Sequence, residues 1–312
     1  MPRRRITFRQ LETFAAVARL NSFTKAADFL HLTQPAVSIQ IKQIVDTIGL
    51  PLFEQTGRDI ALTLAGEELL KTVRSLDDVW NRFESAIDEL KGMKRGKLRV
   101  ALVTTAKYFL PRMLGAFCQR YPEIDIELEI ANREKIVERL RSNQDDLYVM
   151  SYPPNDLDIV RLPFLDNEYV VIAPASHWAA GKQVSLPALA NEPFILREPG
   201  SGSRHVIEQH LRDSNIQVKV RLSLASNEAI RDLVASGMGL SILSRHALGR
   251  DPERDGLAIL NVEGFPLKQA WNVVHLSSKI LSLPAQAFLD ELLGEGIGEA
   301  FGASRPSPSS KT

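Results

Sequence analysis

Residues 22–49 read SFTKAADFLHLTQPAVSIQIKQIVDTIG and predict two short helices joined by a tight turn. The first helix covers about residues 24–30. Thr33 is expected to cap the second helix, because its hydroxyl can accept a hydrogen bond from an N–H of the first turn. Pro35 suits that first turn, where a missing N–H costs little. Gly49 is expected to end the helix, since glycine readily adopts the left-handed conformation found there.

The second helix has an apolar face and a polar face. The apolar side chains recur at the helical period, at Val37, Ile41, Ile44, Val45 and Ile48. The polar face presents Gln34, Ser38, Gln40 and Lys42. In a helix-turn-helix such a face lies in the major groove, where Gln can pair with adenine, Ser can contact a base edge and Lys can neutralise a phosphate. The alternative is an ordinary helical hairpin with a solvated polar face.

The flanking segments favour DNA binding. The chain has 312 residues and a formal net charge of zero, yet residues 1–62 carry eight Lys or Arg and only five Asp or Glu. Arg4 and Arg5 lie in a basic N-terminal arm that could contact DNA. Residues 8–20 form an amphipathic helix, and residues 51–63 suit a two-stranded wing with a turn at Gly57, where Arg58 could hold a phosphate.

A long helix is predicted from residue 63 to about residue 91. Its apolar side chains alternate at spacings of four and three, as in a coiled coil, at Leu69, Val73, Leu76, Trp80, Phe83, Ile87 and Leu90. We predict that this seam pairs two copies of the chain, so that two DNA-reading heads meet a two-fold operator. The alternative is a helix packed on its own domain. Residues 92–96 (GMKRG) are expected to form a hinge.

Residues 97–301 alternate between strand and helix patterns, which predicts an α/β domain with a parallel sheet. We expect two lobes: lobe I from about residues 97–160 and 268–301, and lobe II from about residues 161–267. Residues 302–312 are rich in Pro and Ser, which is typical of a disordered tail.

Two loops between a strand and a helix could bind an anion in a cleft between the lobes. Backbone N–H groups, hydroxyls and the helix dipole all favour negative charge there, and Arg or Lys could pair with a carboxylate or phosphate. Each feature alone is also typical of an ordinary cap, turn or surface salt bridge. The candidate effector-binding residues are Thr104, Thr105, Lys107, Arg197, Ser201, Gly202, Ser203, Arg204 and Asn227.

The sequence argues against other classes of protein. The six His residues have no catalytic or metal-binding spacing, so no enzyme, metal site or resident cofactor is expected. Cys118 is the one cysteine and is predicted to be a buried structural thiol. No apolar run is long enough to cross a membrane, and no signal peptide is visible, so we predict a cytoplasmic protein. A solute-binding protein would account for the two lobes but not for residues 1–62.

The segment TFRQLETFAAVARLNSFTKAADFLHLTQPAVSIQIKQI, followed by GLPLFEQTGRDIALTLAG, resembles the N-terminal domain of LysR-type transcriptional regulators. The resemblance implies a winged helix-turn-helix, a linker helix and a two-lobed effector domain similar to periplasmic binding proteins. It also implies a homodimer or, more often, a homotetramer. The wing departs from the family pattern, because Gln55 stands where an arginine is common, which implies weaker anchoring of the wing.

Further segments resemble the subgroup that controls Calvin-cycle and CO2-acquisition operons, namely TAKYFLPRMLGAFCQRYP, NREKIVERL, DDLYVM, EPFILREPGSGSR and SNEAI. This resemblance implies that the effector is a phosphorylated sugar, a phosphorylated C2 or C3 acid, or a nicotinamide nucleotide such as NADPH. The expected partners are double-stranded DNA, the effector, further copies of the chain and RNA polymerase. Control of sulfur, amino-acid or aromatic metabolism is the alternative.

Overall fold

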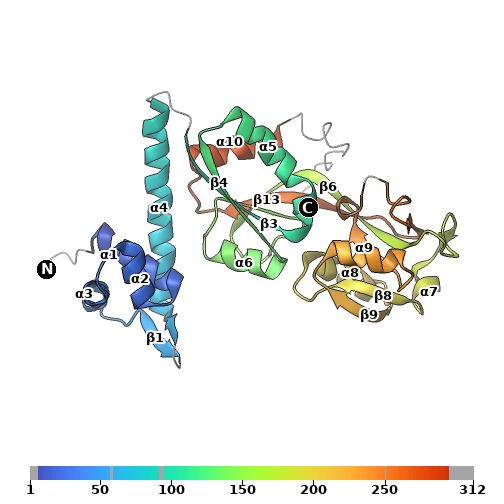
Figure 1. The fold of residues 1–312 in the computed structure, drawn as a ribbon, viewed down its shortest axis with the longest axis horizontal. Coiled ribbons are helices and arrows are strands. Elements are labelled where there is room, and N and C mark those ends of the chain that lie inside the picture. The colour runs from blue at the N-terminus through green and yellow to red at the C-terminus, as the bar shows by residue number, and fades with distance from the viewer. Residues whose placement is uncertain (1–5, 57–58, 91–94, 250, 295–312) are drawn as a thin grey trace. The chain divides into compact units, whose positions relative to one another are not determined.

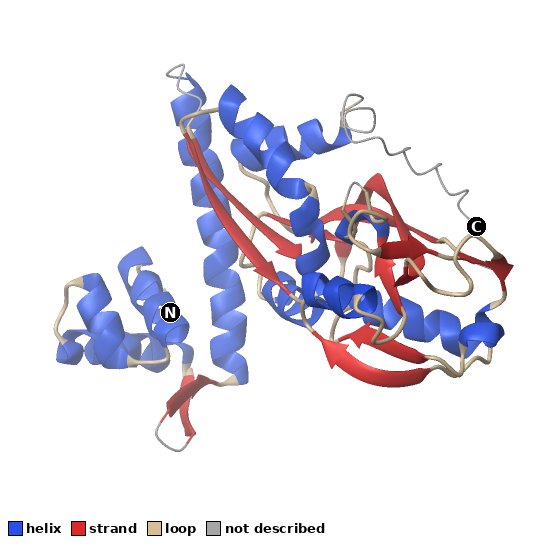
Figure 2. Ribbon diagram, turned by 45° about the vertical axis from the view of Figure 1, so that its right-hand side comes forward, coloured by secondary structure: helices blue, strands red, loops and turns tan. Residues whose placement is uncertain are grey.

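The computed structural model describes residues 6–56, 59–90, 95–249 and 251–294 (Figures 1 and 2). The chain divides into two compact units. The N-terminal unit holds residues up to Glu84 together with Ser142–Gln144, and the C-terminal unit holds the remainder.

The N-terminal unit is a winged helix-turn-helix with a linker helix, as the sequence predicts. The Thr33 hydroxyl accepts a hydrogen bond of 3.4 Å from the N–H of Ala36, and Gly49 ends the second helix with a φ of 84°. Strands β1 and β2 pair antiparallel and form the wing, whose predicted turn at Gly57 and Arg58 lies outside the described residues. The elements are α1 (Phe8–Leu20), α2 (Phe23–Leu30), α3 (Gln34–Ile48), β1 (Phe53–Thr56), β2 (Asp59–Leu62) and α4 (Leu64–Leu90).

A small core holds these elements together. Phe14 and Val17 of α1 pack against Ala26 of α2 and Ile44 of α3, all fully buried. The first turns of α4 join this core, and Gly66 is needed there because an added Cβ would lie 2.1 Å from the Leu52 carbonyl oxygen. The wing and the linker helix therefore touch backbone to backbone.

The predicted hinge and tail lie partly or wholly outside the described residues. Residues 92–94 of the hinge are not described, and its last residue, Gly96, already begins strand β3. The predicted tail, residues 302–312, is not described either.

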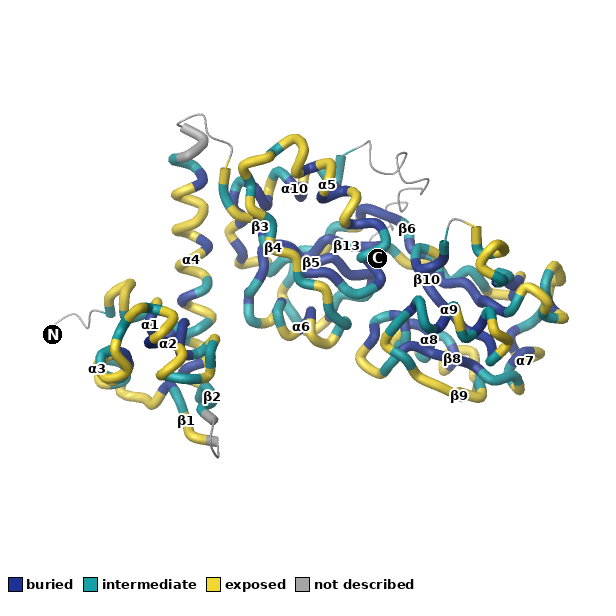
Figure 3. Tube along the Cα trace, in the orientation of Figure 1, coloured by how far each residue is buried: buried dark blue, intermediate teal, exposed yellow. Residues whose placement is uncertain are grey.

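The C-terminal unit is built on a seven-stranded sheet, ordered β10-β6-β13-β5-β3-β4, with β11 also paired to β6. Strands β4, β3 and β5 are parallel, as their strand–helix–strand pattern predicts, whereas β13 and β6 run antiparallel to their neighbours. Figure 3 shows the central strands of this sheet buried. The lobe I elements are β3 (Gly96–Val103), the 3-10 helix η1 (Thr104–Tyr108), α5 (Leu110–Arg120), β4 (Ile124–Ala131), α6 (Arg133–Arg141), β5 (Leu147–Met150) and α10 (Leu283–Leu293).

Lobe II has its own buried cores on the far part of the sheet, around Val171 and Phe194 and around Val170 and Ile195. Its short strands pair as β8 with β9 and as β7 with β12. The lobe II elements are β7 (Gln183–Val184), α7 (Leu186–Leu189), β8 (Pro193–Arg197), α8 (Gly202–Asp213), β9 (Lys219–Leu224), α9 (Asn227–Ala235), β10 (Ser241–Ser244), the 3-10 helix η2 (Arg245–Ala247), β11 (Leu257–Ile259) and β12 (Asn261–Val262).

The two lobes are joined by strands. β6 (Ile159–Pro174) and β13 (Leu267–Leu276) pair with each other along both lobes. Their register shifts between Trp271 and Asn272. The predicted lobe boundaries near residues 160 and 267 fall in these two strands, so continuous strands of the sheet join the lobes.

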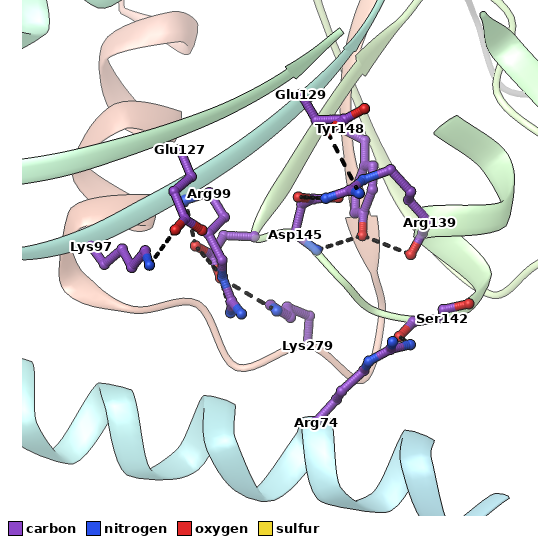
Figure 4. A network of polar contacts seen from close by, with 11 residues as sticks. Arg74, Lys97, Arg99, Glu127, Glu129, Arg139, Ser142, Asp145, Tyr148 and Lys279 are labelled. Carbon is purple, nitrogen blue, oxygen red and sulfur yellow. Dashed lines mark hydrogen bonds and ion pairs between the residues drawn. The ribbon is translucent and has the colours of Figure 1, made fainter. Parts of the chain in front are cut away.

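Buried ion pairs tie the amino ends of the lobe I strands (Figure 4). Asp146 lies 2.9 Å from Nη2 of Arg99 and 3.4 Å from Nζ of Lys279, and Asp145 lies 2.7 Å from Nη2 of Arg139. Burial alone would raise the pKa of Asp146, but the two cations lower it below its usual value. The carboxyl ends of the same strands are thereby left as the edge where a ligand can bind.

The prediction for Cys118 is wrong, because its side chain is exposed on α5. The buried face of this helix consists of Leu110, Met113, Leu114 and Phe117. Cys118 follows Phe117 and lies on the exposed side of the helix, together with Gln119 and Arg120.

Candidate functional sites

Helix α3 presents the predicted DNA-reading side chains on its outer face. Gln34 and Lys42 are exposed, and Nε2 of Gln34 donates a 3.0 Å hydrogen bond to Oγ of Ser38. Thr33 and Pro35 stand at the start of the same helix. Gln34, Ser38 and Lys42 are four residues apart, so their side chains form one stripe along the helix that can enter a major groove.

Gln40 is separated from this stripe. Its Oε1 accepts a 2.8 Å hydrogen bond from the hydroxyl of Thr13, a buried residue of α1. The helical angle between Gln34 and Gln40 is about 240°, which turns Gln40 toward its own domain. Three other predicted DNA contacts, Arg4, Arg5 and Arg58, lie outside the described residues.

Replacing Gln34 with alanine is expected to lower affinity for the operator by about 5–150-fold, because one good base contact contributes about 1–3 kcal/mol of discrimination. Affinity for random DNA should change little. Gln40→Ala is the matched control and should lower thermal stability rather than specificity, since its partner Thr13 is buried. Fluorescence anisotropy measures the ratio of the affinities for operator DNA and random DNA. An equal loss of affinity for both DNAs in Gln34→Ala would exclude base reading by Gln34.

The second site is a cleft between the lobes at the carboxyl ends of β3 and β5. Six of the nine predicted effector residues line it: Thr104, Thr105, Arg197, Ser201, Gly202 and Ser203. Ser201 is the N-cap of α8 but its side chain makes no capping hydrogen bond. Within the described chain, neither its hydroxyl nor that of Ser203 has a protein partner, although both residues are buried. They face the cleft with two donors available.

Arg197 is buried in the wall of the cleft, with 2% of its surface exposed. Its Nε lies 2.8 Å from the Glu198 carboxylate, and its Nη1 donates to Oδ1 of Asn227 at 2.9 Å and to the hydroxyl of Thr105 at 3.5 Å. The charge of Arg197 is therefore balanced within the protein. Its position suits holding the Thr105 and Asn227 side chains in place.

The remaining predicted residues do not line the cleft. Nη1 of Arg204 donates to the Arg197 carbonyl oxygen at 2.9 Å and to the Ser223 hydroxyl at 3.1 Å, away from the cleft. Asn227 is buried behind Arg197. The ammonium of Lys107 pairs with Glu228 at 2.9 Å.

Glu228 joins the two lobes. It accepts a 2.8 Å hydrogen bond from the Tyr108 hydroxyl in addition to its ion pair with Lys107. Burial alone would raise the pKa of Glu228, but hydrogen bonds from Lys107, Tyr108 and Ser226 lower it to about 2. Burial and the same carboxylate raise the pKa of Tyr108 to about 12.

Glu228→Gln should therefore destabilise the domain in a pH-dependent way. Because the pKa of Glu228 is lower in the folded state than the usual 4.5, its carboxylate stabilises the fold above about pH 4.5 and loses this contribution as the pH falls toward 2. Since the pair is partly exposed, the loss at pH 7 should be about 0.2–1 kcal/mol. Thermal unfolding followed by circular dichroism should show a gap at pH 7 that narrows at pH 3.5. A gap of constant size would contradict the assignment.

Seven residues that the sequence interpretation missed also line the cleft: Val103, Asn132, Arg133, Met150, Ser151, Tyr152 and Trp271. Six of them lie at the carboxyl end of β3, β4 or β5 or in the two residues that follow. The rule that ligands meet the carboxyl ends of parallel strands could have indicated them. For Trp271, within an antiparallel strand, the sequence offers no comparable signal.

Arg133 is the most informative of these residues. It begins α6 and lies against the start of α8, because an added Cβ on Gly202 would lie 3.4 Å from Cδ of Arg133. Its Nε donates to the Tyr152 carbonyl oxygen at 2.7 Å, and its guanidinium stacks on the Tyr152 ring. No carboxylate of the described residues lies within ion-pair distance, and burial lowers the pKa of Arg133. This is a half-buried cation without an ion-pair partner among the described residues, and Asp156 acts on it only from a longer distance.

Two negative findings bound these sites. Among the described residues, no group of three or more His, Cys, Asp or Glu side chains could hold a metal ion. In the same ranges no helix combines the length and the apolarity that crossing a membrane requires.

A winged helix-turn-helix head, a linker helix and a two-lobed domain with a polar cleft define a DNA-binding regulator that responds to a small molecule. The chain belongs to the LysR family. Residues 8–67 match the family model described as bacterial regulatory helix-turn-helix protein, lysR family, and residues 91–296 match the LysR substrate binding domain. The family resemblance of the sequence is thereby confirmed, and members of this family are transcriptional regulators rather than enzymes.

The relatives are similar over nearly the whole chain. The transcriptional activator CmpR of Synechocystis sp. is 47% identical over 287 residues, which cover 92% of this chain and 94% of CmpR. The RuBisCO operon transcriptional regulator of Acidithiobacillus ferrooxidans is 42% identical over 306 residues, 98% of this chain and 99% of that protein. The solved CcmR regulatory domain of Synechocystis, in complex with 2-PG, is 47% identical with a TM-score of 0.61, and covers 63% of this chain and 95% of that chain.

Proposed function

We propose that this protein is a cytoplasmic regulator of carbon-fixation genes whose effector is a phosphorylated C2 or C3 acid. One observation carries the proposal. At the start of α8, the hydroxyls of Ser201 and Ser203, which have no hydrogen-bond partner in the described protein, lie near Arg133, which has no ion-pair partner there. A phosphate there would meet the N–H groups of Gly202 and Ser203, both hydroxyls and the guanidinium. Helix N-termini with added donors are well suited to bind phosphate.

The relatives support this choice of genes and ligand. The RuBisCO operon transcriptional regulator is named for such control, and the CcmR domain is named for its complex with 2-PG. NADPH and phosphorylated sugars remain the alternatives within the same class of anion.

The effector would act by binding one arrangement of the lobes more tightly than another, because a ligand can shift an equilibrium only through such a difference in affinity. In this proposal α3 reads a two-fold operator, Arg4, Arg5 and Arg58 hold phosphates, and α4 pairs two chains into a dimer or half of a tetramer. The effector then changes the placement of the DNA-binding heads, and with it the bend of the operator or the contact with RNA polymerase.

Footprinting of the purified protein upstream of its own gene tests this function. The panel is 2-phosphoglycolate, 2-phosphoglycerate, ribulose 1,5-bisphosphate and NADPH. A protected two-fold site whose footprint changes with one of the acids is expected. Protection that no member of the panel alters would contradict the effector class while leaving the regulator intact.

A double variant, Ser201→Ala with Thr105→Ala, should abolish the change in footprint while operator binding persists. Both side chains line the cleft and neither lies in the DNA-binding unit. A Ser214→Ala variant at the other end of α8 is the matched control and should respond like the parent. A full response from the double variant would place the effector elsewhere.

A further inference from the structure

We propose that Trp271 donates a hydrogen bond from its indole N–H to the carboxylate end of the bound effector, which makes Trp271 a specificity-determining residue. The proposal rests on the proposed function and extends it, because the phosphate site alone does not distinguish one phosphate ester from another.

The indole N–H of Trp271 is the first observation. The side chain has 1% of its surface exposed, and its Nε1 has no hydrogen-bond partner in the described protein. Burying an unpaired donor costs folding free energy, so buried donors are nearly always paired. The same side chain lines the cleft, where a ligand atom could accept this hydrogen bond.

The place of Trp271 in the fold is the second observation. It lies in β13 next to the register shift with β6, where the strands pass between the lobes. Its ring packs against Phe109, with ring centroids 5.0 Å apart, and lies 6.2 Å from the ring of His246 in η2. A ligand held by this indole would therefore contact the strand pair that joins the lobes.

The chemistry of the cleft indicates which end of the ligand meets Trp271. Both serines and Arg133 gather at the start of α8 and suit the dianionic phosphate. Trp271, Val103 and Met150 line the same cleft from β13, β3 and β5, and none of these three is a cation. A neutral N–H donor fits a carboxylate oxygen, whereas it would leave the larger phosphate charge poorly compensated. The order is therefore phosphate at α8 and carboxylate at β13.

The test compares two ligands on two full-length proteins by isothermal titration calorimetry. Trp271→Phe removes the N–H and keeps an aromatic ring. It should weaken 2-phosphoglycolate about tenfold, equivalent to about 1.4 kcal/mol, and leave ethyl phosphate, which lacks the carboxylate, unchanged. Trp178→Phe, with an exposed side chain in lobe II, is the matched control and should bind both ligands like the parent.

A second measurement does not depend on the folding of the Trp271 variant. In a Trp80→Phe/Trp178→Phe chain, Trp271 is the one remaining tryptophan, and the hydrogen-bond-sensitive indole band in ultraviolet resonance Raman spectra should shift when 2-phosphoglycolate binds. Binding that leaves this band and the affinity of Trp271→Phe unchanged would overturn the inference alone. A parent protein that binds neither ligand would instead overturn the proposed function, and the inference with it.

Discussion

Replacing Arg133 with alanine is expected to weaken effector binding at least ~30-fold and to leave operator affinity without effector unchanged. Removing one partner of a buried charged pair costs about 2–5 kcal/mol, and each 1.4 kcal/mol is tenfold in affinity. Among the described residues no carboxylate lies at ion-pair distance from Arg133, so a bound anion would be its first direct ion-pair partner. The effect should therefore fall on the liganded state.

The same argument predicts how stability responds. Burial disfavours the Arg133 charge, as its lowered pKa indicates, so Arg133→Ala should change the unfolding temperature of the unliganded protein little. It should also remove the increase that 2-phosphoglycolate produces in the parent. Arg141→Ala is the control on the same helix, because Arg141 pairs with the exposed Asp156. If the Arg133 variant were stabilised by the ligand as strongly as the parent, the anion site at α8 would be wrong.

Local chemistry explains why the secondary structure could be predicted. The ends of α3 were found from Thr33 and Gly49 because a hydroxyl cap and a left-handed glycine act within one turn of the chain. The wing and the strands β3, β4 and β5 followed from apolar periodicity in the same way. Such signals do not depend on what a segment packs against.

The sites were predicted less completely because their side chains form hydrogen bonds and ion pairs with residues that are distant in the sequence. Gln40 and Gln34 are the same type of residue on the same helix, yet the amide oxygen of Gln40 accepts a hydrogen bond from the buried Thr13 of α1. Lys107 follows a strand, as is expected of an anion-binding cation, but it forms an ion pair with Glu228 of lobe II. The sequence gives no signal for Arg133, because it lies in a helix with several other charged side chains. Only the three-dimensional pairing separates these cases.

Phe83→Glu is expected to dissociate the chain into monomers at micromolar concentration and to lower operator affinity by ~100-fold or more. The predicted seam of α4 divides into two parts. Val73 has 3% of its surface exposed and packs in the core of its own winged domain, whereas Trp80 and Phe83 are 52% and 53% exposed. Their rings lie 5.5 Å apart and form an apolar patch on the second half of the helix. This division favours pairing of the second half of α4 with a second chain over packing of the whole helix on its own domain.

A charge at Phe83 would have to be buried in a paired helix, which is costly without a partner, while in the single chain it stays in water. Losing the dimer also removes the second DNA-binding head, and a tethered second contact commonly contributes a factor of 10² to 10⁴ in affinity. Arg82→Glu, about 140° around the helix from the seam, is the matched control and should stay associated. Sedimentation velocity gives the mass and anisotropy gives the operator affinity. If the Phe83 variant sediments like the parent, the dimer interface does not lie at this part of α4, and the alternative of a helix packed only on its own domain is favoured.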